Sequence, residues 1–180
     1  MRSHRSCIAG LAAVAAATAL VPASASAATC AHAGGTQATT SVANLESATR
    51  CLVNEERTKR GLRPLVVSTQ LDAAARAHST DMDRQNYFSH TSKNGDSLVT
   101  RIRRTGYLNG SVSWVVGENI GWGSGSYATP SSMVRRWMNS SGHRANILKG
   151  SFRDVGVGIA RGVPVGGGDG AIFTTDFGRR

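Results

Sequence analysis

Cysteine is scarce in this 180-residue sequence, which contains three. So few cysteines exclude the dense disulfide frameworks by which very small exported domains compensate for a limited core. Cys7 lies in the N-terminal segment, and the other two, Cys30 and Cys51, form an even pair that predicts one disulfide in an oxidising compartment. Closing a loop of about 20 residues would contribute about 3 kcal/mol to stability. A catalytic cysteine is disfavoured, because no further thiol remains.

The sequence also lacks an apolar run long enough to cross a membrane. Its longest run, residues 8–21, has about 14 residues, whereas a spanning helix needs about 18 or more. Arg2 and Arg5 precede this run, and the small residues Ala25-Ser26-Ala27 follow it in the pattern that signal peptidases cleave. We therefore predict a signal peptide over residues 1–27 and a secreted, extracellular protein that does not span the membrane. A short N-terminal membrane anchor is the alternative.

Acidic residues are few: 11 Asp and Glu stand against 21 Lys and Arg, a formal net charge of +10. Loss of Arg2 and Arg5 with the signal peptide leaves +8, which favours anionic partners such as cell-envelope polymers or lipid head groups. Nucleic acid is disfavoured, because the arginines are scattered and the densest group, Arg101, Arg103 and Arg104, has no aromatic platform beside it. We interpret that group as a solvated basic face.

The spacing of apolar residues predicts helices early in the chain and strands late. A flexible leader over residues 28–43 precedes a domain over 44–178. Helical spacing begins at Val42 and ends at Gly61, and further helices are expected after Ser68, after an N-cap at Asp96, from Pro130 and from Gly142. Strands are expected over residues 111–116, 155–159 and 171–177, with glycine-rich loops over 117–125 and 166–170. This order indicates an α+β domain with an antiparallel sheet.

Three residues have the chemistry of a metal site. His90 follows the second helix, Glu118 follows the first predicted strand and His143 lies at the start of the last short helix. Two imidazoles and a carboxylate can hold zinc or another divalent ion with positions open for water. The alternative is local hydrogen bonding of the histidines and pairing of Glu118 with an arginine. His78 lies on the apolar stripe of its helix and is interpreted as a buried core histidine.

Several segments, taken in order, resemble the bacterial branch of the CAP (SCP) superfamily of cysteine-rich secretory, antigen 5 and pathogenesis-related-1 proteins. They cover about residues 44–178: Leu52-Val53-Asn54-Glu55-Glu56-Arg57, Ala77-His78-Ser79-Thr80-Asp81-Met82, Tyr87-Phe88-Ser89-His90, Gly117-Glu118-Asn119-Ile120, Trp137-Met138-Asn139, Gly142-His143-Arg144-Ala145-Asn146-Ile147-Leu148, Val155-Gly156-Val157-Gly158 and Thr175-Asp176-Phe177-Gly178. The resemblance implies an α-β-α sandwich, with an antiparallel sheet between helices and a central cleft.

The resemblance also implies a cleft centre. Animal members carry two histidines and two glutamates there, and His90, Glu118 and His143 match three of the four. The second glutamate should follow the tryptophan at Trp137, but residues 138–141 contain no acid. The set is therefore reduced to three, which lowers the negative charge available to a cation.

Two functions are consistent with these residues. The first is a monomeric binding or interaction module for a lipid, a sterol or an anionic cell-envelope component. The second is a metal-dependent extracellular hydrolase in which His90 and His143 hold zinc and Glu118 is the general base or a third ligand, with Asp81 or Asp96 as further acids. A serine hydrolase using Ser89, Ser140 or Ser141 is disfavoured, because the sequence has no G-x-S-x-G elbow. We expect the binding module, with at most a divalent metal as cofactor.

Overall fold

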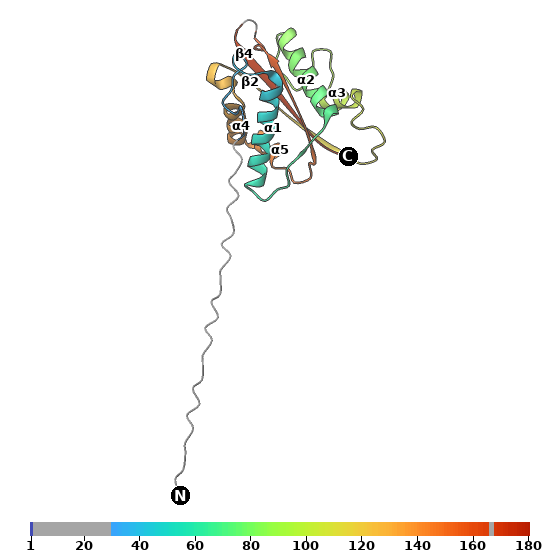
Figure 1. Ribbon diagram of the computed structural model, residues 1–180. Helices are drawn as coiled ribbons and strands as arrows, with labels where there is room; N and C mark the ends of the chain where they lie inside the picture. The colour runs from blue at the N-terminus through green and yellow to red at the C-terminus, as the bar shows by residue number, and fades with distance from the viewer. Residues whose placement is uncertain (2–29, 166–167) are drawn as a thin grey trace.

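The computed structural model describes residue 1, residues 30–165 and residues 168–180 of the chain. The predicted signal peptide therefore lies outside the described residues, apart from Met1. The elements in chain order are α1 (Val42–Thr58), β1 (Val66–Val67), α2 (Thr69–Arg84), α3 (Leu98–Arg104), β2 (Val115–Ser124), the 3-10 turn η1 (Gly125–Ala128), α4 (Pro130–Asn139), α5 (Ser141–Ile147), β3 (Asp154–Arg161) and β4 (Gly170–Arg179) (Figure 1).

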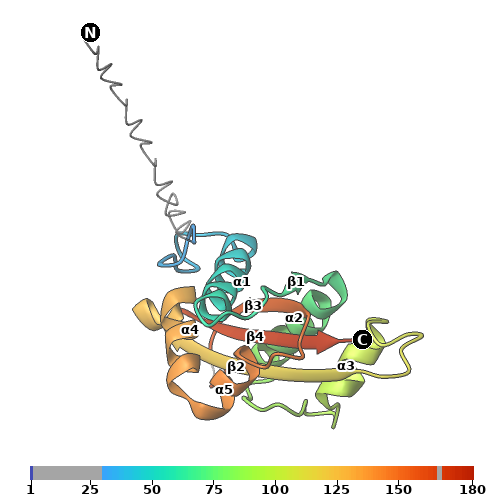
Figure 2. The same ribbon diagram turned by 90° about the horizontal axis from the view of Figure 1, so that it is seen from below.

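The strands form one sheet in the order β1-β3-β4-β2, with helices on both faces (Figure 2). The pairs β3–β4 and β2–β4 are antiparallel, whereas the short β1 pairs with β3 in parallel. One face packs on α1, α4 and α5 through a core that includes Val157, Phe173 and Trp137. The opposite face packs on α2 and α3. The predicted α+β sandwich is confirmed, although β1 makes the sheet mixed rather than purely antiparallel.

Two glycines of β3 let α2 lie directly on the sheet. A Cβ at Gly158 would lie 2.0 Å from the backbone nitrogen of Arg76, and one at Gly156 would lie 2.1 Å from the carbonyl carbon of Leu71. Both distances are far below van der Waals contact, so no side chain fits at either position. The alternation of valine and glycine in this strand thus has two causes: the valines fill the α1 side, and the glycines admit the α2 backbone.

The glycine-rich stretch after Val116 was expected to be a loop, and this prediction was wrong. Strand β2 runs from Val115 to Ser124, whereas residues 111–114 lie outside any strand. The glycines are there for packing rather than for turning: a Cβ at Gly121 would lie 2.4 Å from Met133 Sδ, and one at Gly117 would lie 2.8 Å from Phe152. Gly125 is the position that takes a positive φ, of 52°.

The helix starts follow the sequence signals in two cases and differ in one. The Ser68 hydroxyl accepts a hydrogen bond from Leu71 N, and Thr129 caps α4 with Pro130 at its first turn, as predicted. The cap of α3 is Ser97 rather than Asp96. The Asp96 carboxylate instead pairs with Arg104, since a serine already occupies the capping position.

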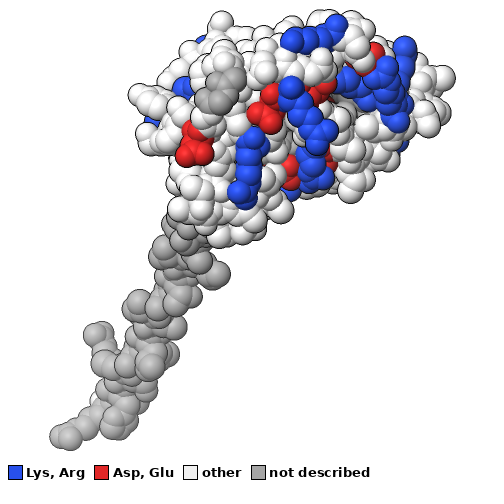
Figure 3. Space-filling model, turned by 90° about the horizontal axis from the view of Figure 1, so that it is seen from above, with Lys and Arg blue, Asp and Glu red and all other residues white. Residues whose placement is uncertain are grey.

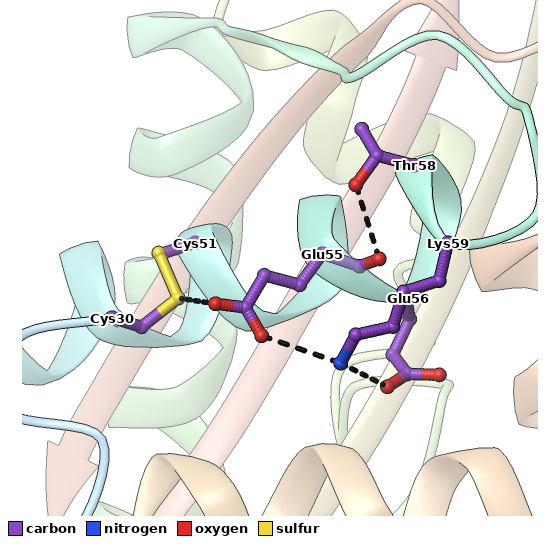
Figure 4. The surroundings of a disulfide bond; sticks show 6 residues. All are labelled: Cys30, Cys51, Glu55, Glu56, Thr58 and Lys59. Carbon is purple, nitrogen blue, oxygen red and sulfur yellow. Dashed lines mark hydrogen bonds and ion pairs between the residues drawn. A yellow bond between two sulfur atoms is a disulfide. The ribbon is translucent and has the colours of Figure 1, made fainter. Parts of the chain in front are cut away.

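A disulfide joins Cys30 to Cys51 on α1 (Figure 4), which confirms the predicted pairing. Residues 30–41 form turns ahead of α1, and a hydrogen bond of 2.9 Å from Ser131 N to Ala33 O ties them to α4 as well. Glu55 Oε1 lies 3.0 Å from Cys30 Sγ. Because a disulfide sulfur carries no proton, this approach is a contact rather than a hydrogen bond. Within the described part of the chain, no helix is sufficiently long and apolar to cross a bilayer.

Candidate functional site

Glu118 is the centre of the site, and both of its oxygens are engaged. Its side chain points from β2 toward α2 and is 2% exposed. Oε1 lies 2.7 Å from His90 Nδ1, and Oε2 accepts a hydrogen bond of 2.6 Å from Arg101 Nη2. Burial opposes ionisation, but the hydrogen bond from His90 and the charge of Arg101 hold the pKa of Glu118 below its usual value. Glu118 is therefore a paired, ionised carboxylate.

Arg101 was interpreted as part of a solvated basic face, and this interpretation was wrong. Its side chain is 6% exposed. Besides Glu118, its Nη1 donates to His90 O at 2.9 Å and to Asp96 O at 3.1 Å. The signal was its spacing, because Arg101 lies three residues after Leu98 and beside Ile102 on the inner side of α3. Arg101 thus fixes both the carboxylate and the loop that carries His90.

His143 reaches the same place from the other layer of the sandwich. It lies on α5, and its backbone carbonyl accepts a hydrogen bond of 3.0 Å from Asn119 Nδ2 of β2. Burial, and second the nearby ring of His90, lower the pKa of His143, which favours the neutral imidazole. The two histidines therefore approach β2 from opposite faces of the sheet, His90 at Glu118 and His143 at Asn119.

In the described residues, the ligand atoms of His90, Glu118 and His143 do not converge as a ready-made three-ligand metal site. Within residues 30–165 and 168–180, Cys30, Cys51 and Glu55 form the group whose three ligand atoms lie within 4.8 Å of one another, and His90, Glu118 and His143 form no such group. The cysteines are a disulfide and supply no thiolate. Glu118 lies behind His90 Nδ1, the position of a carboxylate that orients a metal-binding ring.

A second carboxyl, which the sequence reasoning missed, lies beside Glu118. Asp176 of β4 pairs with Glu118 in the strand register and is fully buried. Neither of its oxygens has a hydrogen-bond partner among the described residues. Burial, and second the charge of Glu118, raise the pKa of Asp176 well above its usual range, which favours the protonated form. The signal was a lone acid in the otherwise apolar and threonine-rich run of residues 171–177.

His78 completes the buried side of the site and is a core histidine, as predicted. It is 0% exposed, and its Nε2 lies 3.0 Å from the carbonyl oxygen of Ser89. A carbonyl only accepts, so Nε2 carries the proton and donates. Burial lowers the pKa of His78, which favours the neutral ring. Its role is to hold the turn from which His90 projects.

The other acids and hydroxyls considered from sequence are engaged elsewhere. Asp81 accepts hydrogen bonds from Gln85 and Tyr87, and Asp96 pairs with Arg104. Within the described residues, no serine hydroxyl is hydrogen-bonded to His90 or His143, and Ser89 Oγ accepts from Thr91 N at 3.1 Å. The arrangement needed to activate a serine nucleophile is therefore not formed in this part of the chain.

A cleft of about 540 Å³ runs along β2 from His143. Its walls include the aromatic side chains of Phe88, Trp122, Tyr127 and Trp137. Side chains of α4 and α5 bind the carbonyls of β2 that point away from β4: Asn146 Nδ2 donates to Glu118 O at 3.0 Å, Trp137 Nε1 to Ile120 O at 3.1 Å and Arg136 Nη2 to Trp122 O at 2.9 Å. The cleft is thus largely apolar, and its floor is fixed by hydrogen bonds.

This sandwich is the fold expected of the CAP class of domains, and comparison with known proteins agrees. The model of the cysteine-rich secretory protein family (CAP) matches residues 51–176. The chain therefore belongs to this family.

Two relatives come from Bacillus subtilis. The chain is 38% identical over 143 residues to YkwD of Bacillus subtilis, which covers 79% of this chain and 50% of YkwD. It is 36% identical over 110 residues to the membrane protein YlbC of the same organism, covering 61% of this chain and 30% of YlbC. The chain thus spans half or less of these relatives.

Among solved structures, an extracellular SCP-domain protein from Bacillus anthracis superposes with a TM-score of 0.60 at 29% identity, over 77% of this chain and 40% of that one. An outer surface protein from Borrelia burgdorferi superposes with a TM-score of 0.59 at 20% identity, over 73% of this chain and 89% of that one. The second similarity shows the shared fold.

Proposed function

We propose that this CAP domain is an exported binding module whose cleft along β2 takes a partly apolar ligand of the cell envelope, such as a lipid or a sterol. The observation that supports this most directly is the cleft itself. Its volume of about 540 Å³ is in the range of small-molecule sites, which are mostly apolar with a few oriented polar groups. Phe88 and Tyr127 on its rim are 42% and 62% exposed, so apolar surface is available to a ligand.

The state of Glu118 argues for binding rather than hydrolysis. A general base must have a free oxygen near the water it activates and a pKa near the working pH. Both oxygens of Glu118 are bonded within the protein, and its pKa is lowered. In a metal-dependent hydrolase using His90, His143 and Glu118, the carboxylate would have to release either His90 or Arg101 before it could act as a base, at a cost in a buried site.

A divalent ion has a place in this proposal. His90 and His143 would hold it, zinc being the preferred ion for imidazole ligands, and Glu118 would orient the His90 ring. If bound, the ion would supply a Lewis acid beside His143, which lines the cleft. With two protein ligands, the affinity should be modest.

Fluorescent probes test the cleft. We expect a fluorescent C18 fatty acid or a fluorescent sterol to bind the wild-type protein, and Phe88→Ala with Tyr127→Ala to weaken binding at least tenfold, because apolar contact is lost on both rims. Val67→Ala is the matched control: Val67 is 53% exposed, lies on β1 at the opposite edge of the sheet and should leave the affinity unchanged. Equal affinities of all three proteins for both probes would refute the cleft as the site.

Calorimetry with zinc tests the metal separately. His90→Ala with His143→Ala should abolish binding, whereas Glu118→Gln should weaken it about 10- to 100-fold, as the loss of an orienting partner does. Zinc binding that is identical in wild type and the double histidine variant would remove the ion from the proposal and leave the ligand cleft untouched.

A further inference from the structure

One end of the sheet carries a surface that the cleft does not explain. It consists of Arg103, Val112, Trp114, Arg179 and Arg180, and we call it the β4-end patch. Val112 is 105% exposed and Trp114 is 37% exposed. The guanidinium carbon of Arg103 lies 5.8 Å from the centre of the Trp114 ring, and Val115, the residue after Trp114, pairs with Arg179 in the sheet. Apolar and cationic groups are therefore interleaved on one surface.

The positive charges of this patch are not neutralised inside the protein. Arg103, Arg179 and Arg180 are exposed, and none forms an ion pair within 4.0 Å among the described residues. Asp154 lies at the same end of the sheet and accepts a hydrogen bond of 2.7 Å from Tyr107 Oη. Figure 3 shows Lys and Arg atoms over the middle and the right of one face of the molecule, with Asp and Glu atoms among them. The patch therefore presents a positive field to its surroundings.

The loop that carries Val112 is held in shape. Gly106 and Gly110 take positive φ values of 79° and 73°, and Ser111 N donates to Leu108 O at 3.2 Å. The buried residues Tyr107 and Leu108 anchor the loop on α3. A projecting valine on an ordered loop loses little conformational freedom when it enters an apolar phase, which lowers the cost of association.

We propose that the β4-end patch docks the protein on an anionic phospholipid bilayer. Indole rings prefer the boundary between head groups and acyl chains, and Val112 would enter beside it. Arginines near an anionic membrane surface each strengthen binding by about fivefold, and stable adsorption takes an apolar and a cationic signal together. A soluble polyanion would use the arginines but would gain nothing from the exposed Val112, so the combination favours the bilayer.

Vesicle co-sedimentation tests this, with protein recovered after export and its N-terminus determined by mass spectrometry. The probes are vesicles of phosphatidylglycerol and phosphatidylcholine in equal parts, and vesicles of phosphatidylcholine alone. Arg103→Gln with Arg179→Gln removes two patch charges. The matched control is Arg84→Gln with Arg135→Gln, because both residues are exposed, neither belongs to the patch, and the net charge changes by the same amount.

We expect binding to the anionic vesicles alone, weakened about 25-fold in the patch variant and unchanged in the charge-matched control. Brominated lipids should quench tryptophan fluorescence of the bound protein, and Trp114→Phe should remove most of the quenching, since Trp137 is buried and the half-buried Trp122 lies near the opposite end of β2. Equal losses in both arginine variants would overturn the proposal, as would binding without quenching of Trp114. If inorganic polyphosphate displaced all of the protein from the vesicles, and brominated lipids did not quench Trp114, the patch would be assigned to a soluble polyanion. Tyr127→Ala distinguishes the two proposals: loss of vesicle binding in this variant, with the patch variant unaffected, would assign the bilayer contact to the cleft and overturn the role of the patch.

Discussion

Replacing Arg101 with Met should destabilise the domain strongly, because it leaves the buried charge of Glu118 without its partner. The two side chains are 6% and 2% exposed and lie 2.6 Å apart. At an effective dielectric constant of about 20, unit charges about 4 Å apart attract by about 4 kcal/mol. Arg101 also donates to the carbonyls of His90 and Asp96, and each such bond contributes about 1 kcal/mol. Breaking a buried pair by removing one partner costs about 3–5 kcal/mol.

The assay is urea unfolding at pH 7, with a double-mutant cycle to isolate the pair. Arg101→Met should lower the free energy of unfolding by about 3–5 kcal/mol, and adding Glu118→Gln should recover at least about 2 kcal/mol, because no charge is left unpaired. Arg104→Gln is the control: its ion pair with Asp96 is exposed, so the midpoint should hardly move. If the effects of Arg101→Met and Glu118→Gln on the free energy of unfolding added within about 0.5 kcal/mol, the two side chains would not be coupled, and the paired, ionised state of Glu118 would be refuted.

Three further predictions concern the core, the second carboxyl and the disulfide. Gly158→Ala should cost at least about 3 kcal/mol or prevent folding, because its Cβ would overlap the α2 backbone, and a soluble variant with an unchanged melting temperature would contradict that packing. Asp176→Asn should stabilise the domain by about 1–3 kcal/mol at pH 7. The pKa of Asp176 is raised in the folded state, so Asp176 destabilises the wild-type protein at pH values above its unfolded pKa and does not do so below it. The stability gained by Asp176→Asn should therefore vanish in melts near pH 3, where the carboxyl is protonated in both states. Cys30→Ser with Cys51→Ser should lower stability by about 3 kcal/mol in calorimetry, since the bridge closes a loop with a sequence separation of 21; a loss under about 1 kcal/mol would show that the other contacts of residues 30–41 suffice.

Most of the fold was predictable from local signals. Helix caps at Ser68 and Thr129 and the apolar spacing of the helices depend on neighbouring residues, so the sequence displays them directly. The glycines of β2 were predicted to form a loop. A glycine needed for a turn and a glycine needed to make room for Met133 cannot be distinguished in the sequence. The difference depends on a helix that follows later in the chain.

The candidate site divides in the same way. His90, Glu118 and His143 were named from their residue chemistry and matched by the family pattern, and the structure places all three beside β2. Whether they hold a metal stays a prediction. Arg101 and Asp176 were missed as members of the site, because their roles come from burial beside Glu118 and from strand register. Charge alone places arginines and aspartates on the surface, and only the packed structure shows which of them are enclosed.

The side-chain hydrogen bonds to β2 have a consequence for association between copies. This strand lies at the edge of the sheet, where unpaired carbonyls invite another chain to add a strand. Trp137 and Arg136 occupy two of those carbonyls and also line the cleft. The groups available to a ligand are therefore the same groups that keep a neighbouring molecule from continuing the sheet. A cleft remodelled for a larger ligand by replacing Trp137 would expose a strand edge, and self-association that rises with protein concentration should follow.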